Sequence, residues 1–252
     1  MAARASWRKD IIGIVDWRRR ELERLGVDVR LNAYAERTDV LAEDPDVVII
    51  ATGGTPDIEW LPGSELVTSV WEAIGSGRAF PSEVIVYDGT GRHPALQAAE
   101  LACAKGAHVQ FVTIDAQLAQ ELTYAERAIW KKRAYELGLA VTVDHQIEKV
   151  VRAGNRLVAT FRNLITRETI ERTAEQVIVE HGTVPADQLY RELRADAANG
   201  GVTDIDALLE GSPQPRQALP AAKFELHRIG DAVASRNIHA AVLDAIRLCH
   251  VM

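Results

Sequence analysis

The sequence predicts an α/β protein with two Rossmann-like lobes on parallel central sheets, plus a small antiparallel meander. Three short apolar runs, residues 47–50, 84–87 and 177–179, support this prediction, because each is followed within a few positions by glycine. Unbroken apolar runs are typical of parallel strands that are buried on both faces. Glycine beyond the strand end lets another segment or a ligand approach the backbone.

The first part of the chain combines helical and extended patterns. Residues 7–25 place apolar side chains on one helix face, and Gly26 ends the helix. Residues 27–31 alternate like a strand, residues 39–43 carry no clear pattern, and residues 69–74 predict a short helix. The apolar positions of the first helix are Ile11, Ile14, Val15, Leu22 and Leu25.

The central stretch has the order strand, glycine turn, helix and strand. Residues 84–87 form the first strand, and the turn contains Gly89 and Gly91. Helical spacing then runs from Pro94 to Gly106, and a second strand follows at residues 109–112. Such a βαβ unit is typical of dinucleotide-binding folds, in which the helix N-terminus receives a pyrophosphate.

Two positions depart from the dinucleotide fingerprint. Pro94 occupies the place of its third small residue, with Ala95 beside it. Thr113 stands where an acidic ribose ligand is expected, and Asp115 follows late. Two interpretations therefore stay open, a nucleotide-binding turn or an ordinary βαβ unit that binds nothing. If a dinucleotide does bind, Asp115 near the ribose favours NAD over NADP.

The remainder of the chain predicts further helices, strands and loops. The expected helices are residues 118–137 and 188–194, and the expected loops are residues 199–201 and 211–215. The expected strands are residues 140–143, an antiparallel meander within 147–162 and 168–173, and 177–179. The last helix is expected to turn Ile238, Ala241, Val242, Ala245 and Leu248 inward.

Composition and charge exclude several classes of protein. The 252 residues are 47% hydrophobic and 26% charged, as is typical of a globular protein with a sizeable core. The net charge of −7, with both signs interspersed, argues against nucleic acid as a partner. No apolar segment is long enough to span a membrane, and the first residues lack a secretion signal. Cys103 and Cys249 form no metal-ligand set, so we expect no metal and a cytoplasmic location.

Two motifs far apart in sequence form a recognisable pair. Residues 51–54, Ala-Thr-Gly-Gly, and residues 229–232, Ile-Gly-Asp-Ala, resemble flavoprotein disulfide reductases, in which an NAD(P)-type domain interrupts an FAD domain. More closely, the chain resembles the C-terminal portion of the trimethylamine dehydrogenase, histamine dehydrogenase and dienoyl-CoA reductase group. The other resembling pieces are residues 8–10 with Trp17, residues 87–93 with Ala99 and Glu100, residues 180–183, and Arg236.

The resemblance implies a set of cofactor-binding residues. Asp231 would accept hydrogen bonds from the ribityl chain of FAD, Gly230 would permit its close approach, and Thr52 and Gly53 would line the adenosine side. A helix cap is the structural alternative for Gly230 and Asp231. The full candidate set, for FAD or an ADP-like nucleotide and for NAD(P)H, is Thr52, Gly53, Gly54, Asp88, Gly89, Gly91, Asp115, Gly182, Gly230, Asp231, Ile238 and Ala241.

Parts of the parent enzymes have no counterpart in this sequence. No strand with a G-x-G-x-x-G turn precedes Trp7, and there is no FMN barrel or iron–sulfur cysteine cluster. The expected lobes are an incomplete FAD-type lobe, residues 1–66 and 213–252, and an inserted NAD(P)-type lobe, residues 67–212. We therefore expect a gap in the first lobe's sheet and half a cofactor site. The chain would be a fragment, a subunit completed by an FMN and iron–sulfur partner, or a relic that no longer holds FAD tightly.

No side chain stands out as a catalyst. His93 and His181 are the histidines worth testing, although each is more often structural, and the charge run at residues 126–133 is typical of a solvated helix face. The leading hypothesis is an electron-transfer module of an NAD(P)H- or amine-linked flavin oxidoreductase, catalytically incomplete alone. The alternative is a non-enzymatic interaction or scaffold subunit whose sheet gap is filled by a partner chain, for example in a homodimer.

Overall fold

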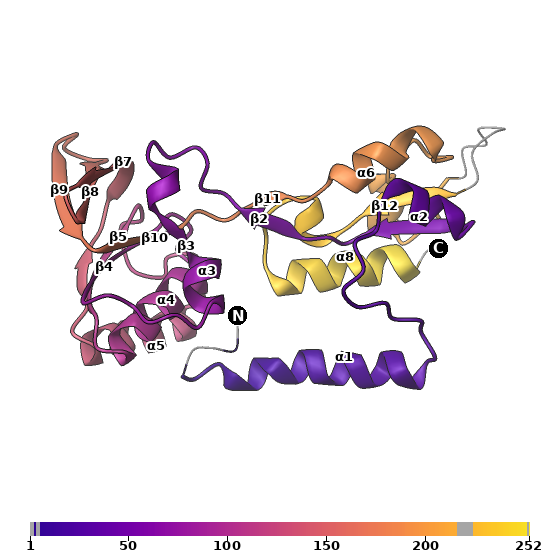
Figure 1. The fold of residues 1–252 in the computed structure, drawn as a ribbon. Coiled ribbons are helices and arrows are strands. Elements are labelled where there is room, and N and C mark those ends of the chain that lie inside the picture. The colour runs from indigo at the N-terminus through magenta and orange to yellow at the C-terminus, as the bar shows by residue number, and fades with distance from the viewer. Residues whose placement is uncertain (1–2, 4–5, 216–223, 251) are drawn as a thin grey trace. The chain divides into compact units, whose positions relative to one another are not determined.

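The computed structural model describes residues 3, 6–215, 224–250 and 252, and its contacts divide the chain into two compact units. Unit 1 comprises Met1–Asp28 and Pro56–Gly182, and unit 2 comprises Val29–Thr55 and Thr183–Met252. The chain therefore passes between units at different positions from the expected lobe borders, 66/67 and 212/213, and those borders stay a prediction. Figure 1 shows the elements of both units.

Unit 1 is built on a five-stranded parallel sheet. The strand order is β3 (Thr68–Ser69), β10 (Gln176–Glu180), β4 (Glu83–Asp88), β5 (His108–Thr113) and β6 (Ala140–Thr142), and every neighbouring pair is parallel. The central strand β4 is buried on both faces, because Val84, Ile85, Val86 and Tyr87 are all fully inaccessible. The α/β class with a parallel central sheet is therefore confirmed.

Helices and a second sheet cover opposite faces of this parallel sheet. Val84 and Val86 pack with apolar residues of α3 (Val70–Gly75), α4 (His93–Ala104) and α5 (Tyr124–Glu136). Ile85 and Tyr87 point the other way, toward the antiparallel sheet. That sheet consists of β7 (His145–Ala153), β8 (Arg156–Asn163) and β9 (Thr169–Ala174), which confirms the predicted meander.

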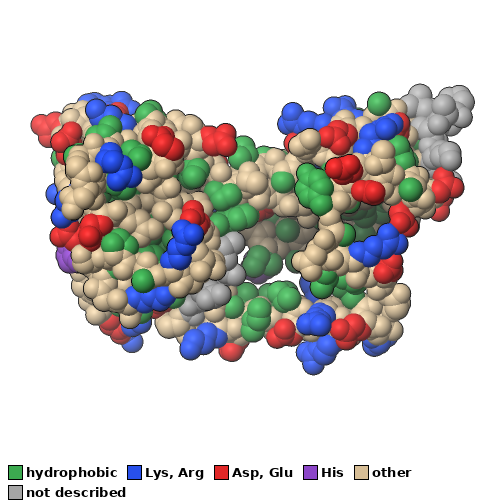
Figure 2. Space-filling view, in the orientation of Figure 1, with side chains coloured by type: hydrophobic (Ala, Val, Ile, Leu, Met, Phe, Trp, Pro, Cys, Tyr) green, Lys and Arg blue, Asp and Glu red, His purple; other side chains and the backbone are tan. Residues whose placement is uncertain are grey.

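Two expectations in unit 1 were wrong in part. The helix expected at residues 118–137 begins only at Tyr124, because the Thr123 hydroxyl accepts the Glu126 N–H as an N-cap and residues 118–122 form turns. Helix α1 (Ile12–Arg24), preceded by the 3₁₀ turn Lys9–Ile11, forms as expected but buries no residue. Its apolar positions face outward, with Trp17 55% and Val15 59% exposed. Figure 2 shows hydrophobic side chains among charged ones along α1.

Unit 2 has a smaller parallel sheet. Strand β1 (Val47–Ile50) pairs with β12 (Glu225–Arg228), and β2 (Gly54–Pro56) pairs with β11 (Thr183–Pro185). Its core contains Ile50, Leu226, Tyr190, Leu193 and Ala232 among other apolar residues. The helical elements are α2 (Arg37–Ala42), α6 (Gln188–Leu193), α7 (Ile205–Glu210) and α8 (Ile238–His250), with 3₁₀ turns at Arg194–Asp196 and Gly230–Ala232.

Several sequence-based expectations for unit 2 need correction. Residues 27–31, of which residues 29–31 belong to this unit, form no strand. Val29 and Leu31 are exposed because no described strand lies beside them. Residues 39–43, which had no assigned pattern, fall largely in α2, and α7 was not predicted. In α8, Leu248 is buried as expected, but Ile238 is 45% exposed and does not face inward.

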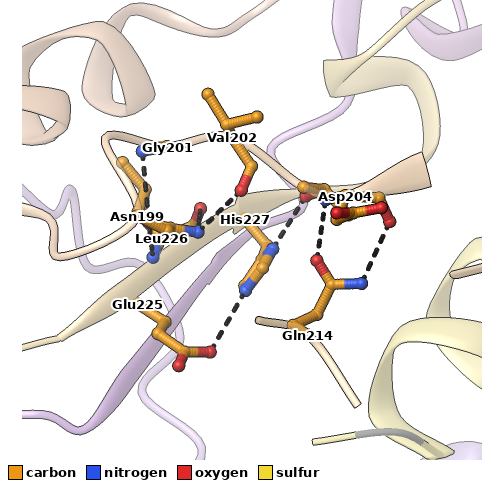
Figure 3. Close-up of polar contacts among 9 residues, drawn as sticks. Asn199, Gly201, Val202, Asp204, Gln214, Glu225, Leu226 and His227 are labelled. Carbon is orange, nitrogen blue, oxygen red and sulfur yellow. Dashed lines mark hydrogen bonds and ion pairs between the residues drawn. The ribbon is translucent and has the colours of Figure 1, made fainter. Parts of the chain in front are cut away.

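The two edges of the β1–β12 sheet differ. The outer edge of β12 is covered, because the Ala198 N–H donates to the Phe224 carbonyl (2.8 Å) and the Asn199 side chain bonds both backbone groups of Leu226, at 3.0 Å each (Figure 3). The outer edge of β1 has no partner strand among the described residues. Parallel sheets are normally larger than two strands and buried on both faces. The incomplete lobe expected from the sequence stays a prediction.

Candidate nucleotide-binding sites

In unit 2, the two motifs that suggested a flavoprotein leave the sheet side by side. Strands β1 and β12 are parallel and in register from Val47 opposite Glu225 to Ile50 opposite Arg228. The Ile229 N–H then donates to the Ile50 carbonyl at 3.0 Å. Residues 51–54 and 229–232 therefore start from the same carboxyl-terminal sheet edge, where ligands of open α/β sheets bind.

The residues that follow β1 have different local tasks. The Thr52 hydroxyl donates to the Ala186 carbonyl (2.5 Å), and a Cβ at Gly54 would lie 2.6 Å from the Val184 carbonyl oxygen. Both residues are therefore used by the fold itself. Gly53 has a left-handed backbone (φ 75°), and a Cβ there would meet no described atom within 4 Å. Of these three candidates, Gly53 presents an open backbone face.

The residues that follow β12 are held by α8 and the loop before it. Gly230 is left-handed (φ 63°), its N–H donates to Asp244 (3.0 Å), and a Cβ would lie 3.3 Å from the Ala241 side chain. Asp231 accepts the Arg236 N–H through Oδ1 at 3.0 Å, a bond to the loop before α8. Its Oδ2 makes no hydrogen bond within the described residues. Gly230 and Ala241 are thus packing partners, while one oxygen of Asp231 stays available.

The N-terminus of α8 is already capped. The Asn237 side chain accepts the Ala240 N–H at 2.9 Å, so part of the helix's amide set is satisfied within the chain. Ile238, a candidate from the sequence, is the first residue of this helix and lies partly in solvent. One of the first amides of this helix is therefore satisfied by its own chain.

In unit 1, the glycine turn after β4 is bonded to its own chain. Asp88 is fully buried, and its Oδ1 accepts the N–H groups of Thr90 and Gly91 at 3.0 Å each. The Gly89 N–H donates to the Glu180 carbonyl at 2.8 Å. The order strand, glycine turn and helix is thus as predicted. The backbone N–H groups of the turn, however, already donate to acceptors within the fold.

Three carboxyl groups gather at the ends of β10, β4 and β5. Glu180 is opposite Asp88 in register, and Asp115 lies just beyond the end of β5. Burial raises the pKa of Asp88 to about 7 and that of Glu180 to about 7. Burial, and then the charge of Glu121, also raises the pKa of Asp115. Glu180 belongs to the resembling piece at residues 180–183 but was not among the candidate cofactor-binding residues, although β10 ends in a carboxylate as β4 does.

His93 and His181 both have structural partners in unit 1. His93 Nδ1 accepts the Trp130 N–H (2.9 Å), and its Nε2 lies 3.2 Å from Glu126. Burial, and then the charge of Arg8, lowers the pKa of His93 to about 4, so the neutral ring carries its proton on Nε2. His181 Nδ1 lies 3.1 Å from Asp57 Oδ2, and Gly182 (φ 79°) donates to Glu180 at 3.1 Å.

The charge run of α5 is not uniformly solvated. Arg133 pairs with Glu100 of α4 at 2.6 Å, and Glu100 is buried. Arg127 donates to the carbonyls of Gln120 and Leu122 at 3.2 and 3.0 Å. Glu100 within an otherwise apolar helix is the sequence signal for such an ion pair. The pair was not predicted, because Arg133 lies 33 positions away from Glu100 in sequence.

Within the described residues, no helix combines the length and apolar character needed to cross a membrane. The same part of the chain contains no cluster of three or more His, Cys, Asp and Glu side chains suited to a metal ion.

No protein-family model matches the chain. The chain is 43% identical over 251 residues to a multifunctional alkene reductase/demethylase from Caballeronia cordobensis, a match that covers 99% of this chain and 37% of that protein. It is 36% identical over 262 residues to an N,N-dimethylglycine/sarcosine dehydrogenase from Chromohalobacter salexigens, covering 99% and 38%. The solved histamine dehydrogenase from Rhizobium sp. 4-9 superimposes with a TM-score of 0.76 at 19% identity, over 99% of this chain and 38% of that one.

These matches define the class of the fold, which is the FAD/NAD(P)-type nucleotide-binding fold of flavin-dependent oxidoreductases. More specifically, the chain is the counterpart of the nucleotide-binding portion of the trimethylamine dehydrogenase, histamine dehydrogenase and dienoyl-CoA reductase group, as its motifs indicated. It spans little more than a third of the length of these relatives, 37% and 38%.

Proposed function

We propose that this chain is an electron-transfer module of a flavin-dependent oxidoreductase, with its site for FAD or another ADP-containing nucleotide in unit 2. The observation that carries the proposal is the side-by-side exit of residues 51–54 and 229–232 from one edge of a parallel sheet. Gly53 has an open backbone face for close approach, and Asp231 keeps one carboxylate oxygen that accepts ribose or ribityl hydroxyls.

The module would be completed by another domain or subunit. The outer edge of β1, which no strand of the described residues pairs with, supports this, because such an edge carries backbone donors and acceptors that a further strand satisfies. The share of the relatives that the chain covers supports it as well. The missing part would carry FMN and an iron–sulfur cluster and oxidise the substrate. Since relatives are a demethylase and a dimethylglycine/sarcosine dehydrogenase, we propose N-methylated amines as that substrate class.

Calorimetric titration of the full chain with ADP and FAD, after an absorbance spectrum, tests the proposal. We expect saturable binding that Gly53→Ala weakens at least tenfold, or about 1.4 kcal/mol. Gly200→Ala is the matched control, because Gly200 lies in the same unit, is also left-handed (φ 58°) and has equally open surroundings. Equal losses in both variants would assign the effect to backbone strain and contradict the site.

A second candidate function is a non-enzymatic interaction or scaffold subunit. The apolar side chains that α1 exposes favour it, since adjacent exposed apolar residues mark interaction surfaces. Sedimentation of the purified chain tests it. A stable homodimer without any ADP or FAD binding would support the scaffold and contradict the cofactor site. Cytoplasmic location stays a prediction under both functions.

A further inference from the structure

The glycine turn of unit 1 is filled by the chain's own atoms. We propose that Asp88 is an internal occupant of the phosphate position of this turn, and that with Asp115 it excludes NAD(P)H from unit 1. In a dinucleotide-binding βαβ unit, the backbone N–H groups of the turn and the helix N-terminus hold the pyrophosphate. Here the carboxylate of Asp88 takes that anionic place, because its Oδ1 accepts the N–H groups of Thr90 and Gly91 at 3.0 Å each.

The backbone N–H groups of the turn already have acceptors within the chain. The Gly89 N–H donates to the Glu180 carbonyl at 2.8 Å. Pro94, at the start of α4, has no N–H to give. The N–H groups of Gly89, Thr90 and Gly91 thus all donate within the fold. A pyrophosphate would therefore have to break the bonds of Asp88 before it gained comparable ones.

The open faces of both glycines are also occupied. A Cβ at Gly89 would lie 2.8 Å from the His181 ring and 3.1 Å from the Glu180 carbonyl oxygen. A Cβ at Gly91 would collide with the carboxylate of Asp115 and lie 3.2 Å from the Glu121 nitrogen, whose N–H donates to the Gly91 carbonyl (3.1 Å). The segment after β5 thus folds over the turn. These glycines make room for protein, where a nucleotide cradle would keep that space for the ligand.

Charge acts in the same direction. Asp88 and Glu180 end neighbouring strands, Asp115 lies just beyond the end of the next one, and the pyrophosphate of a dinucleotide is itself an anion. The pKa values of Asp88 and Glu180, about 7, mean that these groups gain charge as the pH rises through neutrality. The charge of Arg92 lowers the pKa of Glu180, and the hydroxyl of Thr90 donates to Asp88 (3.3 Å). Repulsion therefore adds to the steric exclusion.

This inference rests on the proposed function and limits its cofactors to those that bind in unit 2. A module that binds an adenine nucleotide in unit 2 but rejects NAD(P)H in unit 1 would receive electrons from its partner flavin and not from a nicotinamide. It would suit a dehydrogenase rather than a reductase. Asp88 is then a residue that determines cofactor specificity.

Amide NMR of the full chain during titration with NADH, and separately with ADP, tests the inference in the wild-type protein. We expect the amide signals of Gly89, Thr90 and Gly91 to stay unchanged with NADH up to millimolar concentration. Saturable shifts of these three signals would overturn the inference. Shifts of Gly53 and Gly230 with ADP report on the proposed function independently, so the failure of either idea is recognised without the other.

Two variants test the assignment to Asp88. Asp88→Ala with Asp115→Ala frees both turn amides and the face of Gly91, and we expect saturable NADH binding at least tenfold tighter than in the wild type. Asp88→Asn is the matched control, because it removes the charge but keeps an acceptor oxygen for Thr90 and Gly91, and we expect a much smaller gain in NADH affinity than in the double variant. A folded double variant that ignores NADH, or a gain in Asp88→Asn equal to that of the double variant, would overturn the assignment. If the double variant does not fold, the wild-type titration decides.

Discussion

Asn199→Ala should open the outer edge of the unit 2 sheet. The Asn199 side chain is 8% exposed and makes four hydrogen bonds, to the Val202 carbonyl (3.0 Å), the Gly201 N–H (3.1 Å) and both backbone groups of Leu226 (Figure 3). A buried hydrogen bond contributes about 1 kcal/mol net, so we expect unit 2 to lose roughly 4 kcal/mol. Such a loss is a large share of the stability of a small unit.

Hydrogen exchange followed by mass spectrometry measures this loss locally. The peptide that covers β12 should lose protection by the factor that corresponds to roughly 4 kcal/mol, about a thousandfold. The peptide that covers β4 in unit 1 serves as the internal reference and should keep its protection.

Gln214→Ala is the matched control for Asn199→Ala. The side-chain amide of Gln214 likewise bonds both backbone groups of one residue: it accepts the Asp204 N–H at 2.8 Å and donates to the Asp204 carbonyl at 3.1 Å. Gln214 is only half-buried. We expect a loss of about 1 kcal/mol from this variant. A loss below about 1 kcal/mol in Asn199→Ala, or equal losses in both variants, would refute the idea that the side chain of Asn199 substitutes for a neighbouring strand.

Two further predictions concern unit 1. Gly63→Ala should destabilise it by at least about 3 kcal/mol, because Gly63 is left-handed (φ 88°) and a Cβ would collide with the Val150 backbone carbonyl. Gly106→Ala, left-handed (φ 90°) but in open surroundings, should lose only about 1–2 kcal/mol in the same thermal denaturation, and similar losses would contradict the collision. The pKa values of Asp88 and Glu180 are raised from 3.8 and 4.5 to about 7, so the native state binds more protons than the unfolded chain between these values. The free energy of unfolding should therefore fall as pH rises from about 4 to about 7, and Asp88→Asn with Glu180→Gln should flatten this slope in chemical denaturation; an unchanged slope would show that other groups cause it.

The parallel core could be predicted from the sequence because its signals are local. Residues 84–87 are apolar without interruption, and only a strand buried on both faces uses such a run, so β4 forms within one residue of each expected end. The pairing of residues 51–54 with residues 229–232 was likewise recognised in advance, and the register of β1 and β12 places both motifs at one sheet edge. The prediction of a strand was wrong where the segment has no neighbouring strand to pair with. Residues 27–31 alternate correctly but lie beside no described strand, and alternation stabilises a strand only within a sheet.

The sequence by itself determined the order strand, turn, helix and strand of the central βαβ unit and the meander that follows it, because backbone sterics and hydrophobic periodicity act over a few neighbouring residues. Only the tertiary structure decided what the glycines are for. A glycine in the sequence permits a left-handed backbone or a close approach to it, but it does not state whether a ligand, the chain itself or only solvent lies beside it. At Gly89 and Gly91 the space is filled by His181 and Asp115, which lie 92 and 24 positions away in sequence, whereas at Gly53 it is open. Such contacts depend on how distant segments pack, and no local rule contains that information.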